Sequence, residues 1–110
     1  MTPLRLALNY LEAFCSANIE ALSELLADDL SFQGPFHTSG SAGEYLDALR
    51  SDPPEAAEFE LLHSYEDAAS ACLVYQYTKP GVSVPMALMC KVRDGRISEI
   101  LLIFDRMGFT

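Results

Sequence analysis

A histidine in an alternating stretch of the chain is the first residue suited to acid–base chemistry. Phe59, Leu61, His63 and Tyr65 stand two residues apart. This period of two predicts a strand whose inward face includes His63. An imidazole that loses solvent tends to stay neutral, which suits a general base near pH 7. We therefore interpret His63 as a candidate catalytic residue, although a single inward histidine also occurs as an ordinary core residue.

Three phenols could act together with such a base. Tyr75 and Tyr77 share one face of a second alternating run, and Tyr10 lies at the flank of the apolar stripe of the first helical run. A phenol inside an apolar cavity can donate a hydrogen bond to a carbonyl or enolate oxygen. The same large rings also pack well as plain interior residues. Tyr10 is the second catalytic candidate, and Tyr75 and Tyr77 are candidates for ligand contact.

Other recognisable reactive groups are few. His37 follows Gly34-Pro35-Phe36 in a loop, where it could contact a ligand at a pocket rim or simply be solvated. The sequence contains no Gly-rich phosphate loop and no nucleophile elbow. It has only two histidines, and no acid is placed beside either of them. We therefore predict no metal site and no cofactor.

The composition restricts the class of protein. The chain has 110 residues and a net charge of -9, which predicts a single domain over residues 1–110. The excess of carboxylates opposes the phosphate backbone, so we expect no nucleic-acid partner. The apolar runs are far shorter than the ~20 residues that span a bilayer, so we expect no membrane partner.

The N-terminus and the cysteines bear on cellular location. The first residues enter an amphipathic pattern directly, without the features of a signal peptide. Three cysteines share no short spacing, which indicates free thiols rather than a disulfide framework or a zinc site. These observations predict a protein of the reducing cytoplasm.

Helical periodicity dominates the first half of the chain. Ser41 with Glu44 three residues later forms a capping box, and Thr2 and Asn18 are further N-cap residues. The predicted helices span 3–16, from Asn18 to Asp28-Asp29, and from Ser41 to Asp52-Pro53-Pro54. A short strand is expected at 30–33.

The second half has the period of strands. The predicted strands span 58–66, 71–78, 82–92 and 97–104, with Asp94-Gly95 as the turn of the last hairpin. Helices followed by a meander of strands predict an α+β fold. We expect the three N-terminal helices to pack on the concave face of a curved antiparallel sheet.

The last two strands are apolar on both faces, which bears on assembly. Ala87 and Met89 alternate with residues of the inner face, as do Leu101 and Ile103. One layer of helices covers only one face, and monomers rarely expose an apolar patch of that size. We therefore predict a homodimer that forms through the outer sheet face; the alternative is that the C-terminal tail folds back over this face.

The segment at 18–32, Asn-Ile-Glu-Ala-Leu-Ser-Glu-Leu-Leu-Ala-Asp-Asp-Leu-Ser-Phe, resembles the second helix and first strand of a known superfamily. These are the SnoaL-like and ketosteroid-isomerase-like proteins, which share the nuclear transport factor 2 fold. Tyr10-Leu11, Gly34-Pro35 and Asp94-Gly95-Arg96-Ile97 extend the similarity over nearly the whole chain. The resemblance implies a cone with a pocket at its open end, and it leaves the activity open because this fold serves many activities.

The functional residues of the ketosteroid isomerase carry over only in part. That enzyme, which is a standard example of pKa tuning, uses a carboxylate base, a tyrosine and a protonated aspartate. The resemblance aligns the tyrosine with Tyr10, but it aligns the base with Gly34 and the protonated acid with Ala87 or Leu88. Two of the three groups are absent, which argues against steroid isomerisation by that mechanism.

Two functions from different classes follow. The first is a SnoaL-like protein whose mostly apolar pocket holds a small lipophilic molecule, with its catalytic status open. The alternative is a cofactor-independent isomerase, cyclase or lyase that acts on an enolisable carbonyl compound, with His63 as base and Tyr10 as oxyanion donor. An adapter with an acidic surface for a basic partner is a third hypothesis. The candidate ligand-binding residues in the implied pocket are Phe14, Phe32, Phe36, His37, Tyr65, Tyr75, Tyr77, Leu88, Leu102 and Phe104.

Overall fold

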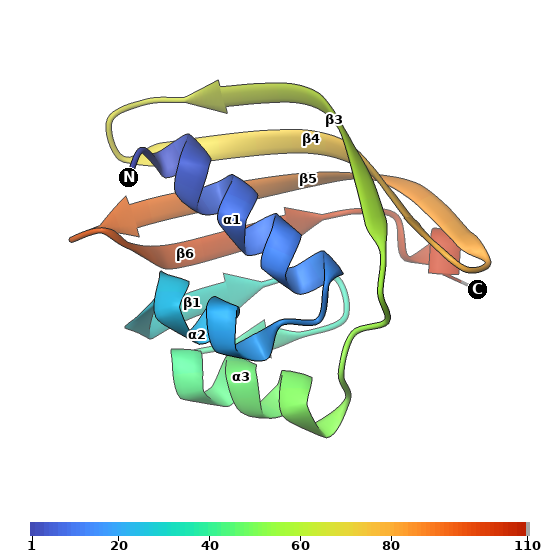
Figure 1. Ribbon diagram of the computed structural model, residues 1–110, viewed down its shortest axis with the longest axis horizontal. Helices are drawn as coiled ribbons and strands as arrows, with labels where there is room; N and C mark the ends of the chain where they lie inside the picture. Colours follow the sequence, from blue (N-terminus) through green and yellow to red (C-terminus); the bar gives the residue numbers. More distant parts are fainter. Residues whose placement is uncertain (110) are drawn as a thin grey trace.

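The computed structural model describes residues 1–109 and has three α-helices in the first half of the chain, with β1 and β2 between the second and the third, and four long strands in the second half (Figure 1). The helices are α1 (Pro3–Cys15), α2 (Ile19–Leu25) and α3 (Ala42–Ser51), with a short 3-10 helix η1 (Arg106–Phe109) after the last strand. The strands are β1 (Leu26–Gln33), β2 (Thr38–Ser39), β3 (Glu58–Glu66), β4 (Ser70–Lys79), β5 (Val82–Arg93) and β6 (Arg96–Ile103).

All three predicted N-caps are present. The side chains of Thr2, Asn18 and Ser41 each accept a hydrogen bond from the backbone N–H three residues later, as N-cap residues do. One boundary differs from the prediction. Helix α2 ends at Leu25, and Asp28-Asp29 lies within β1 rather than at the helix end, because Leu26 already pairs with Ile97 of β6.

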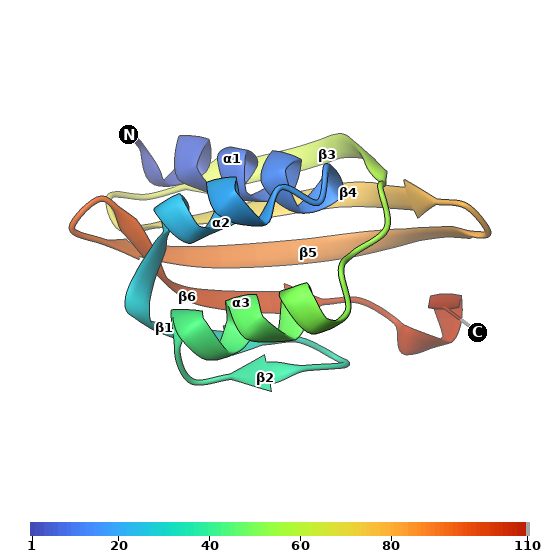
Figure 2. The same ribbon diagram turned by 60° about the horizontal axis from the view of Figure 1, so that its bottom comes forward.

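The six strands form one sheet in the order β2-β1-β6-β5-β4-β3. Every neighbouring pair is antiparallel except β1 and β6, which are parallel; the sheet is therefore mixed rather than purely antiparallel. Figure 1 shows α1 crossing β4, β5 and β6, with α2 and α3 beside β1, and Figure 2 shows the same helices on one side of the sheet. The predicted α+β fold with three helices on one sheet face is confirmed.

The prediction that His63 and Tyr65 face inward is wrong, because β3 contains a bulge. Leu61 pairs with Tyr75 but His63 pairs with Val74, so Leu62 is an extra residue without a partner across the strand. A bulge of this kind shifts the alternation of side chains. In the first half of β3, Phe59 and Leu61 lie opposite the inner-face residues Tyr77 and Tyr75, as predicted. His63 and Tyr65 lie opposite residues of the outer face and are exposed.

The core lies between the helices and the inner sheet face. Tyr75 and Tyr77 of β4 are buried there, as the alternation predicts, together with Leu88 of β5. Cys15 and Cys90 are buried thiols, and Cys72 is half-buried and also unpaired. Within residues 1–109, no helix is long and apolar enough to cross a membrane.

Candidate functional site

A cavity of about 610 Å³ opens at one end of the core. Its walls come from α1, α3, the inner sheet face, the loop between β1 and β2, and η1. Ten residues singled out in the sequence line it: Tyr10, Phe14, Phe32, Phe36, His37, Tyr75, Tyr77, Leu88, Leu102 and Phe104. His63 and Tyr65 do not, because they lie on the opposite face of the sheet. The size and the aromatic walls are those of a site for a small organic molecule.

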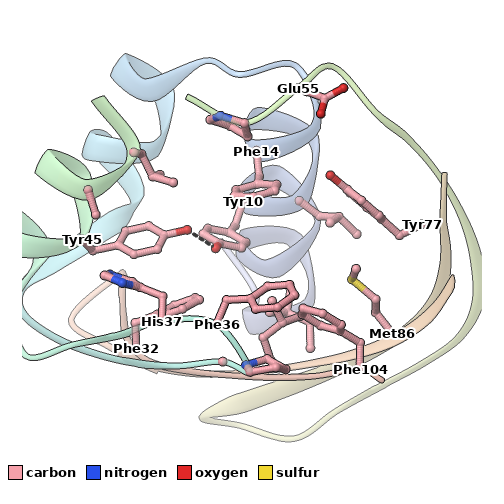
Figure 3. A pocket seen from close by; sticks show the side chains of 18 of the residues that line it. Tyr10, Phe14, Phe32, Phe36, His37, Tyr45, Glu55, Tyr77, Met86 and Phe104 are labelled. Carbon is pink, nitrogen blue, oxygen red and sulfur yellow. Dashed lines mark hydrogen bonds between the residues drawn. The ribbon is translucent and has the colours of Figure 1, made fainter. Parts of the chain in front are cut away.

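Two phenols meet inside this cavity. Tyr10 projects from α1 and Tyr45 from α3, and Figure 3 shows their hydroxyl groups directed at each other. The two oxygens are 2.5 Å apart, and the residues are only 4 % and 2 % exposed. Burial is the main cause that raises the pKa of both phenols, since the phenolate form would lose its solvation. Both groups are therefore neutral hydroxyls at physiological pH.

The pair has one hydrogen more than it uses. Each neutral phenol carries one O–H, and a single hydrogen bond joins the two oxygens. One hydroxyl donates within the pair, and the hydrogen of the other has no acceptor among the hydrogen bonds of residues 1–109. A ligand oxygen that accepts this hydrogen would complete the network. The pair therefore has one O–H that is not used within the protein.

Two further phenols add donors along the sheet wall. Tyr75 and Tyr77 line the cavity, and within residues 1–109 their hydroxyls have no hydrogen-bond partner in the protein. Since no buried polar side-chain atom of the described residues is unsatisfied, these hydroxyls reach the cavity space. Burial raises the pKa of Tyr77 to about 12 and also raises that of Tyr75. Both remain protonated donors over the physiological pH range.

His37 forms part of the wall near the phenol pair. Its Nε2 lies 2.6 Å from the hydroxyl oxygen of Ser39, a residue that is only 2 % exposed. Its ring also faces Tyr45 and Phe32, with ring centroids 6.5 and 6.1 Å away. Ser39 and the two rings therefore fix the orientation of the imidazole beside the cavity.

The end of the cavity at η1 carries the only ion pair among the described lining residues. The Nζ atom of Lys79 lies 3.3 Å from a carboxylate oxygen of Glu55 and 5.5 Å from the ring centroid of Phe109. Phe36 is 61 % exposed and stands beside Phe109, with ring centroids 5.6 Å apart. This end of the cavity is thus polar at one side and aromatic at the other.

Sequence reasoning missed Tyr45, Lys79, Glu55 and Phe109 as parts of this site. The sequence pattern places Tyr45 in the apolar stripe of its helix, and nothing local shows that its hydroxyl meets a residue 35 positions away. One general signal was present, because a buried tyrosine needs a partner for its hydroxyl.

The positions that align with the isomerase acids are structural walls. A Cβ atom at Gly34 would lie 3.3 Å from the ring of Phe32, and Leu88 is a buried apolar residue. Neither position offers a carboxyl group to the cavity. Within residues 1–109, no group of three His, Cys, Asp or Glu side chains could hold a metal ion.

Comparison with known proteins supports the family suggested by the sequence. Residues 7–100 match the family model described as SnoaL-like domain. No curated protein sequence matches the chain.

Solved structures show the same fold at low sequence identity. An NTF2-like protein of unknown function from Cytophaga hutchinsonii has a TM-score of 0.81 at 18 % identity, covering 99 % of this chain and 96 % of that one. A protein from Kribbella flavida, proposed to be a ketosteroid isomerase, has a TM-score of 0.81 at 19 % identity, covering 94 % and 78 %. An LEH-like epoxide hydrolase from M. tuberculosis has a TM-score of 0.80 at 19 % identity, covering 96 % and 84 %.

Proposed function

The chain belongs to the SnoaL-like family, and we propose that its function is to bind a small, mostly apolar molecule carrying an oxygen that accepts hydrogen bonds. The carbonyl group of a ketone is the simplest such acceptor. The molecule would lie in the cavity of about 610 Å³ with its oxygen at the phenol pair. Aromatic and aliphatic walls supply the affinity, and the phenols select the acceptor.

The unused hydrogen of the phenol pair is the observation that carries this proposal. Tyr10 and Tyr45 are both buried and both neutral, yet they share one hydrogen bond between two donors. A buried donor without an acceptor costs about 1–3 kcal/mol. A ligand oxygen removes that cost, whereas a purely apolar ligand leaves it in place.

The geometry does not support the enzymatic alternative with His63 as base. His63, the proposed base for an enolisable carbonyl compound, is exposed on the other side of the sheet from Tyr10. General base catalysis needs the base within hydrogen-bond reach of the proton that it removes. The cavity retains donors that would polarise a carbonyl group. The position that aligns with the carboxylate base of the isomerase is Gly34, which has no side chain to act as a base.

Fluorescence titration tests the binding function. N-phenyl-1-naphthylamine, a neutral apolar dye, should brighten when it enters the cavity, and methyl ketones should displace it. Ala48→Trp would place a large ring at the lining residue Ala48 of α3 and should abolish dye binding. Ser51→Trp, at an exposed position of the same helix, is the matched control and should bind normally. Equal dye binding by both variants would contradict the proposal.

We also propose that a second copy of the chain covers the outer sheet face. Support comes from the outer patch, which we define as Val74, Ala87, Met89, Leu101 and Ile103. These residues are cross-strand neighbours, and Ile103 is 56 % exposed. The C-terminal turn does not cover the patch, because Gly108 lies against the inner-face residue Val84. An apolar patch on a sheet face suits a self-complementary dimer.

A further inference from the structure

The C-terminal turn η1 forms the outer end wall of the cavity. After β6, the chain turns so that Phe109 packs against Phe104, Phe36 and Tyr77, with ring centroids 4.9, 5.6 and 6.4 Å away. Phe109 is half-buried and lines the cavity. Figure 1 shows η1 next to the hairpin of β4 and β5, near the C-terminus of the chain. Its position therefore limits how far a ligand can extend.

Local bonds shape this turn, and side chains hold it in place. The backbone N–H of Met107 donates to a carboxylate oxygen of Asp105, and the backbone N–H of Gly108 donates to the carbonyl oxygen of Asp105. Arg106 places its guanidinium group over the ring of Phe36, 5.7 Å from the centroid, and Lys79 stands over the ring of Phe109. Such contacts between rings and cations are individually weak. The position of η1 therefore depends on how closely its atoms pack against β5.

The closest fit is at Gly108. A Cβ atom at this position would lie 2.1 Å from Cγ1 of Val84, far closer than two carbon atoms can approach. Val84 is buried on the inner face of β5, and its cross-strand partner is Tyr77. Gly108 does not have a positive φ, so any residue could adopt its backbone conformation. Space alone demands a glycine here.

We propose that Gly108 is a positioning residue: its contact with Val84 seats Phe109 as the end wall, which sets the ligand length that the cavity accepts and the rate of ligand exchange. This inference rests on the proposed binding function. A side chain at position 108 displaces η1 from β5 and withdraws Phe109 from Phe36 and Phe104. The cavity then opens at its end, and its polar interior at Tyr10 and Tyr45 is unchanged.

Gly108→Ala is the direct test. We expect dye to dissociate about tenfold faster, because most changes in affinity at one site arise in the dissociation rate. We also expect the best displacing methyl ketone to shift to a longer chain. Gly40→Ala is the matched control, since a Cβ atom there meets nothing within 4 Å and Gly40 has no positive φ. It should keep both the rate and the length preference of the wild type.

Two further variants separate positioning from a general loss of stability. Val84→Ala removes Cγ1, so the double variant Gly108→Ala/Val84→Ala should regain the wild-type length preference. Phe109→Ala removes the wall itself and should resemble Gly108→Ala, which keeps the test decisive if the alanine at 108 prevents folding. The inference would be overturned if the double variant kept the longer ketone preference of Gly108→Ala. It would also be overturned if Phe109→Ala kept the ketone length preference of the wild type.

Hydrogen exchange in the ligand-free protein distinguishes this inference from the proposed function. The amides of Met107 and Gly108 should exchange faster in Gly108→Ala than in the wild type, and the double variant should restore their protection. If neither the wild type nor any variant binds the dye, the proposed function fails, and the exchange rates still decide whether Gly108 seats the turn. If the wild type binds dye but these amides exchange equally in all variants, the inference alone is wrong.

Discussion

At the scale of single residues, the central feature is a pair of neutral phenols in a closed environment. Tyr10 and Tyr45 come from two helices, and their hydroxyls would each be costly to bury alone. Pairing satisfies one donor and leaves one hydrogen for a ligand. Removing both hydroxyls therefore removes the donor, whereas removing either one leaves an O–H on the other.

The double variant Tyr10→Phe/Tyr45→Phe should weaken the displacement of dye by methyl ketones about fivefold, which corresponds to about 1 kcal/mol for one lost hydrogen bond. The affinity for the dye itself should stay unchanged, because N-phenyl-1-naphthylamine has no carbonyl oxygen. Either single variant should have a smaller effect, because the remaining phenol keeps one O–H for the ligand. Tyr65→Phe removes a hydroxyl from the exposed outer face and is the matched control. Equal ketone affinities in Tyr10→Phe/Tyr45→Phe and in Tyr65→Phe would contradict the proposed acceptor site.

The buried phenols also make stability depend on alkaline pH. Burial raises the pKa values of Tyr10, Tyr45, Tyr75 and Tyr77 above 10.0, the ordinary value for a tyrosine side chain in water. The folded chain thus holds these protons more tightly than the unfolded chain does. Their contribution to stability is complete below pH 10 and declines as the pH rises from 10 towards about 12, the pKa of Tyr77.

Urea unfolding at a series of alkaline pH values measures this effect. The free energy of unfolding should fall steadily above pH 10, where tyrosines of the unfolded chain begin to ionise. In Tyr65→Phe, which lacks the exposed phenol, phenolate absorbance should rise together with the loss of circular dichroism. A protein in which these phenols ionise without unfolding would show absorbance rising well before the structure is lost, contrary to their placement in the core.

At the scale of elements, one extra residue in β3 decides which face its second half presents. The bulge at Leu62 shifts the register by one residue, so that His63 and Tyr65 lie opposite Val74 and Cys72 of the outer face. Glu66 then returns to the inner side, where its carboxylate accepts a hydrogen bond from the backbone N–H of Leu4. The bulge thus removes the imidazole from the cavity and ties the end of β3 to α1.

Deleting Leu62 should be tolerated, with a change in unfolding free energy within about 1 kcal/mol, because Leu61 and His63 would then pair with successive residues of β4. Deleting Ser64 is the matched control. It would turn Tyr65 inward and Glu66 outward and should cost about 3 kcal/mol or more. Thermal unfolding of the two deletions compares them directly. Equal losses of stability would show that Leu62 is not the extra residue.

At the scale of the whole molecule, the sheet separates two apolar surfaces with different surroundings. The inner face carries the cavity, and the outer patch has no helix over it. The ion pair between Lys91 and Glu99 lies beyond one end of this patch, with its atoms 3.1 Å apart. A polar border around an apolar centre is the usual composition of a protein interface.

The wild type should sediment as a dimer at micromolar concentration. Ile103→Lys places a charge in the outer patch and should shift the protein to monomer, since an unpaired charge in an apolar interface is costly. Ser51→Lys adds the same charge at an exposed site of α3 and should remain dimeric. A wild type that sediments as a monomer would remove the proposal of a dimer through the outer sheet face.

The sequence by itself determined the three helices, the long strands and ten of the residues that line the cavity. Local signals report structure within a few residues. Examples are the N-cap residues Thr2, Asn18 and Ser41. The period of two that places Tyr75 and Tyr77 on one face is another. Only the tertiary structure decided where His63 points, that Tyr45 meets Tyr10, and that Phe109 returns to the cavity. Each of these depends on pairing between distant segments: a bulge is defined by the partner strand, and the phenol pair joins residues 35 positions apart. The periodicity of apolar residues within one strand does not predict such contacts.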